Sequence, residues 1–164
     1  MVKQQSSGAG PQPTRRQSRD REEAMRVGAK AKGNVWRRPR SLFEVVSEAE
    51  SAEDIGYNLA DFLDHVNALA RQPSAARRVA ASLRTEPAPT GDAVQDAYLA
   101  AVAAHLSHGL RLRAPAWTEQ KNRRLDHPWF ALPHAWARAT LLRDSPAAFR
   151  ERNLFTTEDA LHRA

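Results

Sequence analysis

The sequence of 164 residues contains no cysteine. Disulfide bonds, thiol catalysis and a cysteine-type zinc site are therefore excluded. It has no run of about 18 apolar residues, so no transmembrane helix is expected. The first thirty residues are polar and basic without an apolar stretch, so no secretory signal is expected either. Together these absences predict a cytoplasmic protein without membrane contact.

The sequence also lacks the common catalytic motifs. Its seven glycines are scattered, and none falls in a GxGxxG or P-loop pattern. No serine lies in a nucleophile elbow. No stretch alternates polar and apolar residues over six positions, so no strand is predicted. We therefore expect an all-α protein that is not an enzyme and binds no cofactor or metal.

The net charge of +6 is unevenly distributed. Residues 1–40 hold eleven Lys or Arg against three Asp or Glu, a charge of +8, whereas residues 41–164 carry −2. The basic character therefore belongs to the N-terminal segment. Arginine outnumbers lysine 21 to 4 and alanine is abundant, a composition typical of a GC-rich bacterial genome.

Residues 1–40 are predicted to form a disordered basic tail, because they offer too little apolar surface to offset the entropy of ordering. Their arginines could contact the phosphates of a nucleic acid. A solvated tail without a ligand, or translation that starts at Met25, explains the same composition. The arginines proposed for nucleic-acid binding are Arg15, Arg16, Arg19, Arg37 and Arg38.

Residues 41–164 are expected to form a single helical domain, a compact bundle of six or seven helices. Ser41 and Ser51 each precede an acidic residue by three positions, the spacing of a capping box. Apolar residues then recur at helical spacing and predict an amphipathic helix over Ala52–Arg71. Pro73 is expected to open the next helix in its first turn.

A further helix is predicted from Asp92, as the N-cap, to about His108, with Gly109 as the C-cap glycine. Its apolar residues predict one buried face. That face comprises Val94, Ala97, Tyr98, Ala101, Val102, His105 and Leu106.

The stretch Pro115–Phe155 holds three of the four tryptophans. Large rings bury much area, so this stretch predicts an aromatic-rich C-terminal cap. Its prolines should divide it into short helices over Thr118–Leu125, His134–Arg143 and Pro146–Glu151. Ser145 is expected to cap the last of these.

Two sets of histidines and acids could carry chemistry. His105 and His108 lie three apart and could hold a metal ion, but no third ligand has matching spacing. The interpretation without a metal, a half-buried His105 and a His108 near the helix end, is favoured because two histidines without a third ligand are a weak match. Asp61 and His65 lie four apart and could act together, although an ordinary helix-surface pair has the same spacing.

The basic run Lys121–Arg124 lies between Trp117 and Trp129 and could contact a nucleic acid by stacking and charge. A solvated helix face with its aromatics turned inward explains the run as well, because Glu119 and Asp126 flank it.

Two blocks, PAWT…LDHPWF at Pro115–Phe130 and LRDSPAAFRERNLFTTEDALHRA at Leu142–Ala164, resemble a family of small bacterial proteins of unknown function. Its members often lie beside genes for nucleotidyltransferase-like toxins. The resemblance implies a candidate antitoxin whose partner is a protein toxin encoded nearby. The most family-like positions are Trp129, Phe130, Ser145, Pro146, Phe149, Arg150, Arg152, Asn153 and Phe155.

The leading hypothesis is thus a non-enzymatic helical interaction protein. Its expected partner contacts are Phe149, Arg150, Arg152 and Phe155, because arginine and aromatic residues are enriched at interface hot spots. Surface ion pairs to Asp144 or Glu151 would explain the two arginines equally well. A nucleic-acid-associated protein that binds through its Arg-rich N-terminal arm is the alternative.

Overall fold

The computed structural model describes residues 37–161, and a serine caps each of the first two helices within this range. Helix α2 (Leu42–Ser47) follows Ser41, whose Oγ accepts a hydrogen bond from the backbone N–H of Glu44 at 3.2 Å. Helix α3 (Ala52–Ala70) follows Ser51, whose Oγ accepts one from the N–H of Asp54 at 3.1 Å. Both predicted caps are confirmed, since each satisfies a backbone donor that the first helical turn leaves without a partner.

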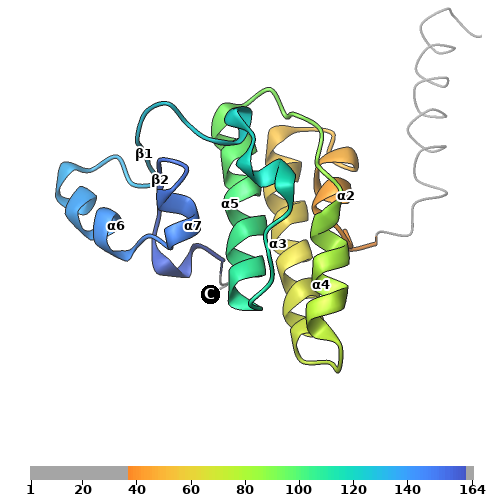
Figure 1. The fold of residues 1–164 in the computed structure, drawn as a ribbon. Helices are drawn as coiled ribbons and strands as arrows, with labels where there is room; N and C mark the ends of the chain where they lie inside the picture. Colours follow the sequence, from red (N-terminus) through yellow and green to blue (C-terminus); the bar gives the residue numbers. More distant parts are fainter. Residues whose placement is uncertain (1–36, 162–164) are drawn as a thin grey trace, which may run out of the picture. The chain divides into compact units, whose positions relative to one another are not determined.

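Helix α4 (Ala75–Arg84) begins later than expected. Pro73 lies in the turn before it, and Ser74 takes a left-handed conformation with a φ of 65°. The prediction that Pro73 opens this helix is wrong, because the left-handed residue reverses the chain first. Helices α3 and α4 then pack against each other and lie side by side in Figure 1.

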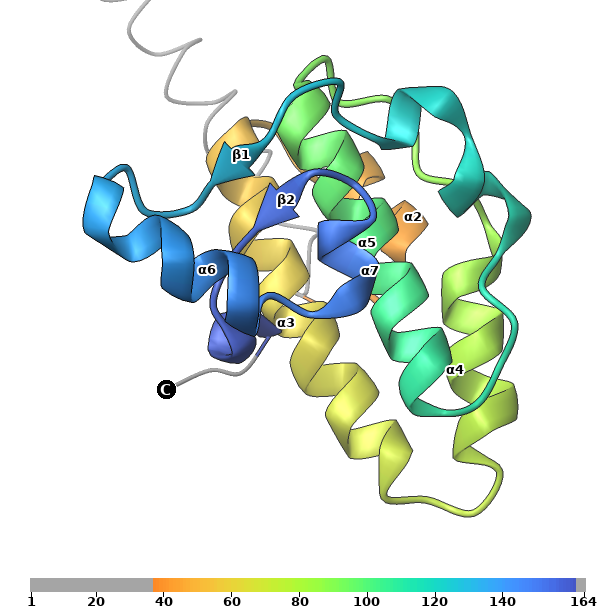
Figure 2. The same cartoon turned by 60° about the vertical axis from the view of Figure 1, so that its left-hand side comes forward.

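Helix α5 (Ala93–Gly109) is the centre of the compact unit Arg38–Ala164. It contacts α4 on one side and the C-terminal segments on others (Figures 1 and 2). The expected cap is confirmed, because Asp92 Oδ1 accepts a hydrogen bond from the N–H of Val94 at 2.8 Å. The prediction of a single buried face is wrong, since the helix is buried nearly all round, as expected for a core helix. Its buried residues are Asp96, Ala97, Leu99, Ala100, Ala101, Val102, Ala103, Ala104 and Ser107.

The end of α5 also differs from the prediction. Gly109 is the last helical residue and does not take a positive φ. The left-handed residue is Arg111, with a φ of 55°. The chain reverses there, and the N–H of Leu112 donates to the carbonyl of Ser107 at 2.8 Å.

The C-terminal third consists of short segments. The helix expected over Thr118–Leu125 is replaced by two 3₁₀ turns, η1 (Ala116–Glu119) and η2 (Lys121–Arg123). A third 3₁₀ turn, η3 (Ala135–Ala137), leads into α6 (Arg138–Asp144).

Two short strands are present in this third of the chain. Strand β1 (Trp129–Phe130) precedes α6 in the sequence, and strand β2 (Leu154–Phe155) follows the short helix α7 (Ala147–Arg150). The strands pair in parallel, with Trp129 opposite Leu154 and Phe130 opposite Phe155 (Figure 2). The expectation of no strand is wrong for these segments, because two residues are too few to display alternation.

Ser145 does not cap α7, contrary to the prediction. Its Oγ donates toward the carbonyls of Leu141 at 2.6 Å and Thr156 at 2.8 Å, and it lies 2.8 Å from the N–H of Thr156. This hydroxyl therefore joins the end of α6 to the segment after β2. The last described element is the 3₁₀ turn η4 (Glu158–Leu161).

Six α-helices lie within residues 37–161, and the prediction of a mostly helical protein is confirmed. The expected aromatic cap is not, because the rings do not form one cluster. Phe149 belongs to the main core and meets Tyr98 edge-on at 5.1 Å between ring centroids. Phe130 and Phe155 stack at 5.0 Å in a second, smaller cluster. Trp136 belongs to neither and is 75% exposed.

Candidate functional site

The four residues predicted to bind a partner do not share a surface. Phe149 and Arg152 are fully buried and Phe155 is nearly so, whereas Arg150 is exposed. A buried side chain cannot contact a partner while the fold is intact. The prediction is therefore corrected for Phe149, Arg152 and Phe155, which stabilise the fold, and Arg150 remains as a candidate contact.

Arg152 follows α7, and its side chain points into the protein. Its Nη1 donates to the carbonyl of Ala148 at 2.8 Å, and its Nη2 donates to the carbonyl of Thr118 at 2.8 Å and to Glu119 Oε1 at 3.0 Å. Burial lowers the pKa of Arg152, and the carboxylates of Glu119 and Glu151 act in the opposite direction. The arginine therefore ties α7 to η1, which are distant in sequence.

Arg123 makes a second buried connection. Its Nη1 lies 3.2 Å from Asp96 Oδ1, and its Nη2 lies 3.1 Å from Glu86 Oε1. The Nη2 also donates to the carbonyl of Pro87, and the guanidinium lies over the ring of Trp117 at 5.3 Å from its centroid. One side chain thus joins η2, α5 and the loop after α4.

The basic run Lys121–Arg124 is divided by this arrangement. Arg123 is fully buried, whereas Lys121 and Arg124 are exposed. Its interpretation as a solvated helix face is wrong for Arg123, because the acids that neutralise it come from other parts of the chain. Arg123 cannot contact a nucleic acid either, because its side chain is buried.

The histidine and acid pairs lie on α5 and α3 without converging on a site. His105 is half-buried and meets the ring of Phe149 edge-on at 6.3 Å, while His108 is exposed. Asp61 and His65 are both half-buried on α3. Within residues 37–161 no three His, Cys, Asp or Glu side chains gather closely enough to hold a metal ion.

The arginines of the predicted nucleic-acid arm fall mostly outside the described residues. Arg15, Arg16 and Arg19 lie there, as does most of the tail predicted over residues 1–40. Arg37 and Arg38 are described, and both are exposed. The hypothesis of a phosphate-contacting arm stays a prediction.

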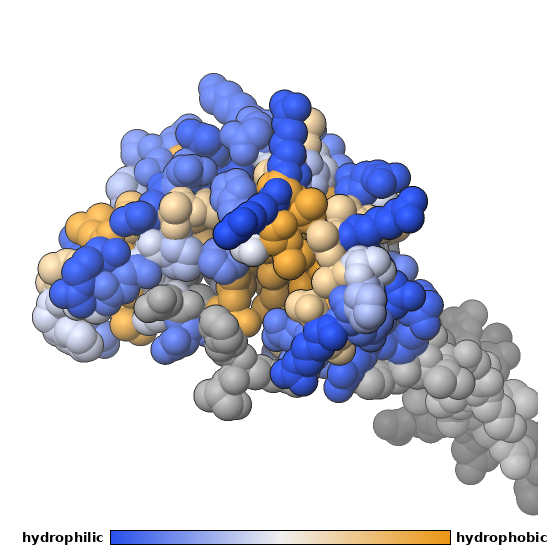
Figure 3. All heavy atoms as spheres, turned by 60° about the horizontal axis from the view of Figure 1, so that its bottom comes forward, coloured by the Kyte–Doolittle hydropathy of each residue, from blue (hydrophilic) through white to orange (hydrophobic). Residues whose placement is uncertain are grey.

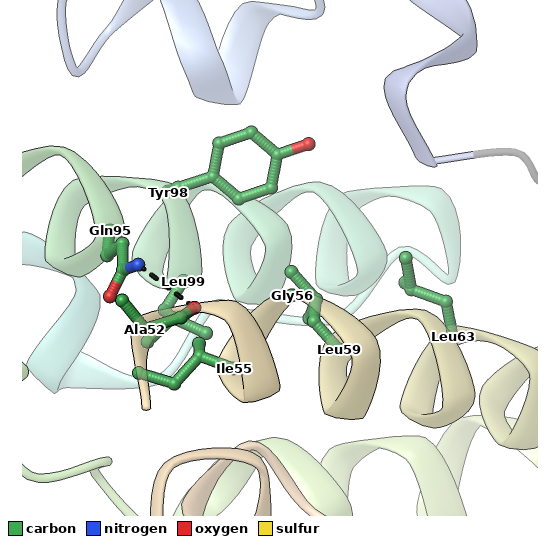
Figure 4. A pocket seen from close by; sticks show the side chains of 8 residues that line it. All are labelled: Ala52, Ile55, Gly56, Leu59, Leu63, Gln95, Tyr98 and Leu99. Carbon is green, nitrogen blue, oxygen red and sulfur yellow. Dashed lines mark hydrogen bonds between the residues drawn. The ribbon is translucent and has the colours of Figure 1, made fainter. Parts of the chain in front are cut away.

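A groove lies between α3 and α5, and no pattern in the sequence predicts it. It encloses a volume of about 310 Å³. Figure 4 shows its aliphatic side chains following one another along α3, with α5 beside them. We call it the α3–α5 groove. Its lining residues are Ala52, Ile55, Gly56, Leu59, Leu63, Gln95, Tyr98 and Leu99.

The groove presents few polar groups. The amide of Gln95 donates from Nε2 to the carbonyl of Ala52 at 3.3 Å and so links the two helices (Figure 4). The other polar side chain is Tyr98, whose ring packs on Phe149. In the view of Figure 3, apolar side chains form a patch on the surface that is surrounded by hydrophilic side chains.

Burial raises the pKa of the Tyr98 hydroxyl above its ordinary value. Above about pH 10, tyrosine in the unfolded chain loses its proton while Tyr98 in the folded chain retains it. The free energy of unfolding should therefore fall as pH rises from this value toward the folded-state pKa. We expect Tyr98→Phe to remove this part of the alkaline loss, as measured by urea midpoints between about pH 9 and 11.

The control for this prediction is Tyr57→Phe, because Tyr57 is 60% exposed. That variant should keep the alkaline loss of the wild type. Equal pH dependence in Tyr98→Phe and the wild type would contradict the assignment.

Comparison with protein-family models, with curated proteins and with solved structures gives no match. The resemblance of the two C-terminal blocks therefore stays a prediction. Among the helices of residues 37–161, none has the length and apolar character that a membrane span requires.

The α3–α5 groove and the buried Arg123 differ in how far the sequence indicates them. The apolar spacing of α3 predicted an amphipathic helix, but it gave no sign that Ile55, Leu59 and Leu63 are only half-buried. The buried position of Arg123 had no local signal, because its partners lie 27 to 37 residues earlier in the chain.

Proposed function

We propose that this chain is a non-enzymatic helical interaction protein, and that it acts in the cytoplasm as the antitoxin of a separately encoded protein toxin. The observation that carries the proposal is the α3–α5 groove. Apolar grooves between helices are a common mode of protein recognition, because they bury the apolar face of a partner segment. The groove is lined mostly by aliphatic side chains, a surface suited to binding.

The resemblance of the C-terminal blocks supports a protein toxin as the partner. Members of the family that these blocks resemble often lie beside genes for nucleotidyltransferase-like toxins. Within these blocks, Phe149, Arg152 and Phe155 are core residues and do not contact the partner. Their role in the proposal is to hold α7 in place, where Arg150 is exposed.

The test is to express the adjacent gene alone and together with this chain. Expression alone is expected to inhibit growth, and co-expression is expected to relieve the inhibition. The two products should also co-purify. An adjacent product that is harmless and does not co-purify would contradict the proposal. Binding of nucleic acid by the full chain, lost when residues 1–36 are deleted, would instead favour the alternative of an Arg-rich arm.

A charge reversal tests the remaining predicted contact. Arg150→Glu is expected to weaken co-purification if Arg150 faces the toxin, because reversing a charge at an interface adds repulsion. Arg84→Glu makes the same change at an exposed position on α4 and is the matched control. Equal co-purification by both variants would remove Arg150 from the interface.

A further inference from the structure

Gly56 has no evident role in the folded chain. It lies inside α3 and does not take a positive φ, so its backbone does not require glycine. A Cβ placed on it would meet no atom within 4 Å, so packing does not require glycine either. Glycine weakens a helix relative to alanine because it loses more backbone entropy on folding. Gly56 therefore lowers the stability of α3 without a packing or backbone reason in the folded chain. Because glycine allows close approach, we infer that the backbone of another molecule lies against α3 at this position.

The groove residues of α3 form one continuous stripe. They occupy positions 52, 55, 56, 59 and 63, which are spaced by three and four and so share one face of the helix. Eleven steps of about 1.5 Å give a length of roughly 16 Å, or three helical turns. Ala52 and Gly56 are the small members, and Ile55, Leu59 and Leu63 are the large ones. A surface three helical turns long fits another helix better than a compact small molecule.

The charge around the groove indicates which kind of partner helix would bind there. Helix α3 contains four Asp or Glu, and neither α3 nor α5 contains a Lys or Arg. Glu53, Tyr57 and Asp64 each follow a stripe residue by one position, which places them about 100° further round α3. The hydroxyl of Tyr57 donates to Glu53 Oε1 at 3.1 Å, so an exposed ring lies on the same border as the acids. The border is therefore acidic and includes an aromatic residue of the type enriched at binding hot spots.

We propose that the α3–α5 groove binds a basic amphipathic helix of the partner, an inference that rests on the proposed function as an interaction protein. The apolar face of that helix packs on Ile55, Leu59 and Leu63, and its backbone crosses α3 at Gly56. Its Lys and Arg side chains lie beside Glu53 and Asp64. Association is therefore faster at low salt, because opposite charges attract over about a Debye length.

The direct test uses the full chain and a synthetic 18-residue peptide. The peptide carries Leu at helical positions i, i+3, i+4, i+7 and i+11 and Lys at most other positions. Fluorescence anisotropy should detect binding that weakens as salt rises. A peptide with Glu in place of every Lys is expected to bind at least about tenfold more weakly, which corresponds to about 1.4 kcal/mol. Equal affinity for both peptides would overturn the charge assignment.

The decisive variant is Gly56→Leu, because the fold and the complex respond in opposite directions. A Cβ at position 56 meets open space in the free protein, and leucine has a higher helix propensity than glycine, so the melting temperature should rise by about 2–5 °C. It also fills the groove, so peptide affinity should fall by about tenfold or more. Ala139→Leu adds the same side chain at an exposed position of α6 and should leave affinity unchanged. A stable Gly56→Leu variant with wild-type affinity would overturn the proposal.

The same variant separates this inference from the proposed function. If the adjacent gene product co-purifies with the wild type but not with Gly56→Leu, both stand. If it co-purifies with both, the interaction function stands and the groove is not its site. If the basic peptide binds but the adjacent product does not, the groove inference stands and the antitoxin function fails. Binding of a nucleic acid in the groove, in place of either, would overturn the inference.

Discussion

Replacing Phe149 by alanine is expected to lower the free energy of unfolding by about 3–5 kcal/mol. The ring is fully buried in the main core, where it meets Tyr98 edge-on at 5.1 Å and His105 at 6.3 Å. Truncation removes the ring from the contact between α7 and α5 and leaves a cavity that the surrounding helices can fill only in part. Urea denaturation of the variant and the wild type gives the difference directly.

The control for this change is another aromatic residue from the same third of the chain. Trp136 is 75% exposed, so Trp136→Ala should alter stability by no more than about 0.5 kcal/mol. If Phe149→Ala were as stable as the wild type, the ring would not be a core residue and the original prediction of a partner contact would return.

Removal of the Arg123 side chain should have an effect of similar size. Arg123→Ala is expected to lower the free energy of unfolding by about 3–5 kcal/mol, the range for breaking one partner of a buried ion pair. The reason is that Asp96, only 7% exposed, would remain in the core without its counter-ion. The carbonyl of Pro87 would lose its donor as well.

Arg124 provides the matched control for this prediction. Its side chain is 51% exposed and lies 3.8 Å from Glu119, so Arg124→Ala should change stability by less than about 1 kcal/mol. Equal and small effects of the two substitutions, measured by urea denaturation, would mean that Arg123 does not hold η2 to α5. A double variant, Arg123→Met with Asp96→Leu, should recover much of the loss, because apolar replacements of a buried pair are often tolerated.

The N-terminal helices were predictable because their signals are local. Ser41, Ser51 and Asp92 each satisfy backbone donors two or three residues further along the chain, so sequence spacing alone defines the cap. The length of α3 follows in the same way from its apolar period.

The turns were less predictable. The left-handed conformations at Ser74 and Arg111 occur at residues other than glycine, so composition gave no sign of them. In each case the turn position decided the backbone conformation, and the residue type did not.

The candidate site was also predictable only in part. Periodicity placed Ile55, Leu59 and Leu63 on one face of α3, but whether that face is covered depends on the spacing of α3 and α5. Similarly, Arg150 and Arg152 look alike in sequence, yet one is exposed and the other is fully buried. The position of α7 against α5 and η1 makes this distinction, since it brings the carbonyl of Thr118 to the Arg152 guanidinium.

The sequence by itself determined that the described chain is mostly helical and where its three capped helices begin, because capping and helical periodicity act over a few residues. Only the tertiary structure decided which arginines are buried, how the aromatic rings divide between two cores and that a groove lies between α3 and α5. These features depend on contacts such as that of Trp117 Nε1 with the carbonyl of Leu83, 34 residues apart. Long-range contacts of this kind leave no local pattern, so they become visible only when the packed chain brings the partners together.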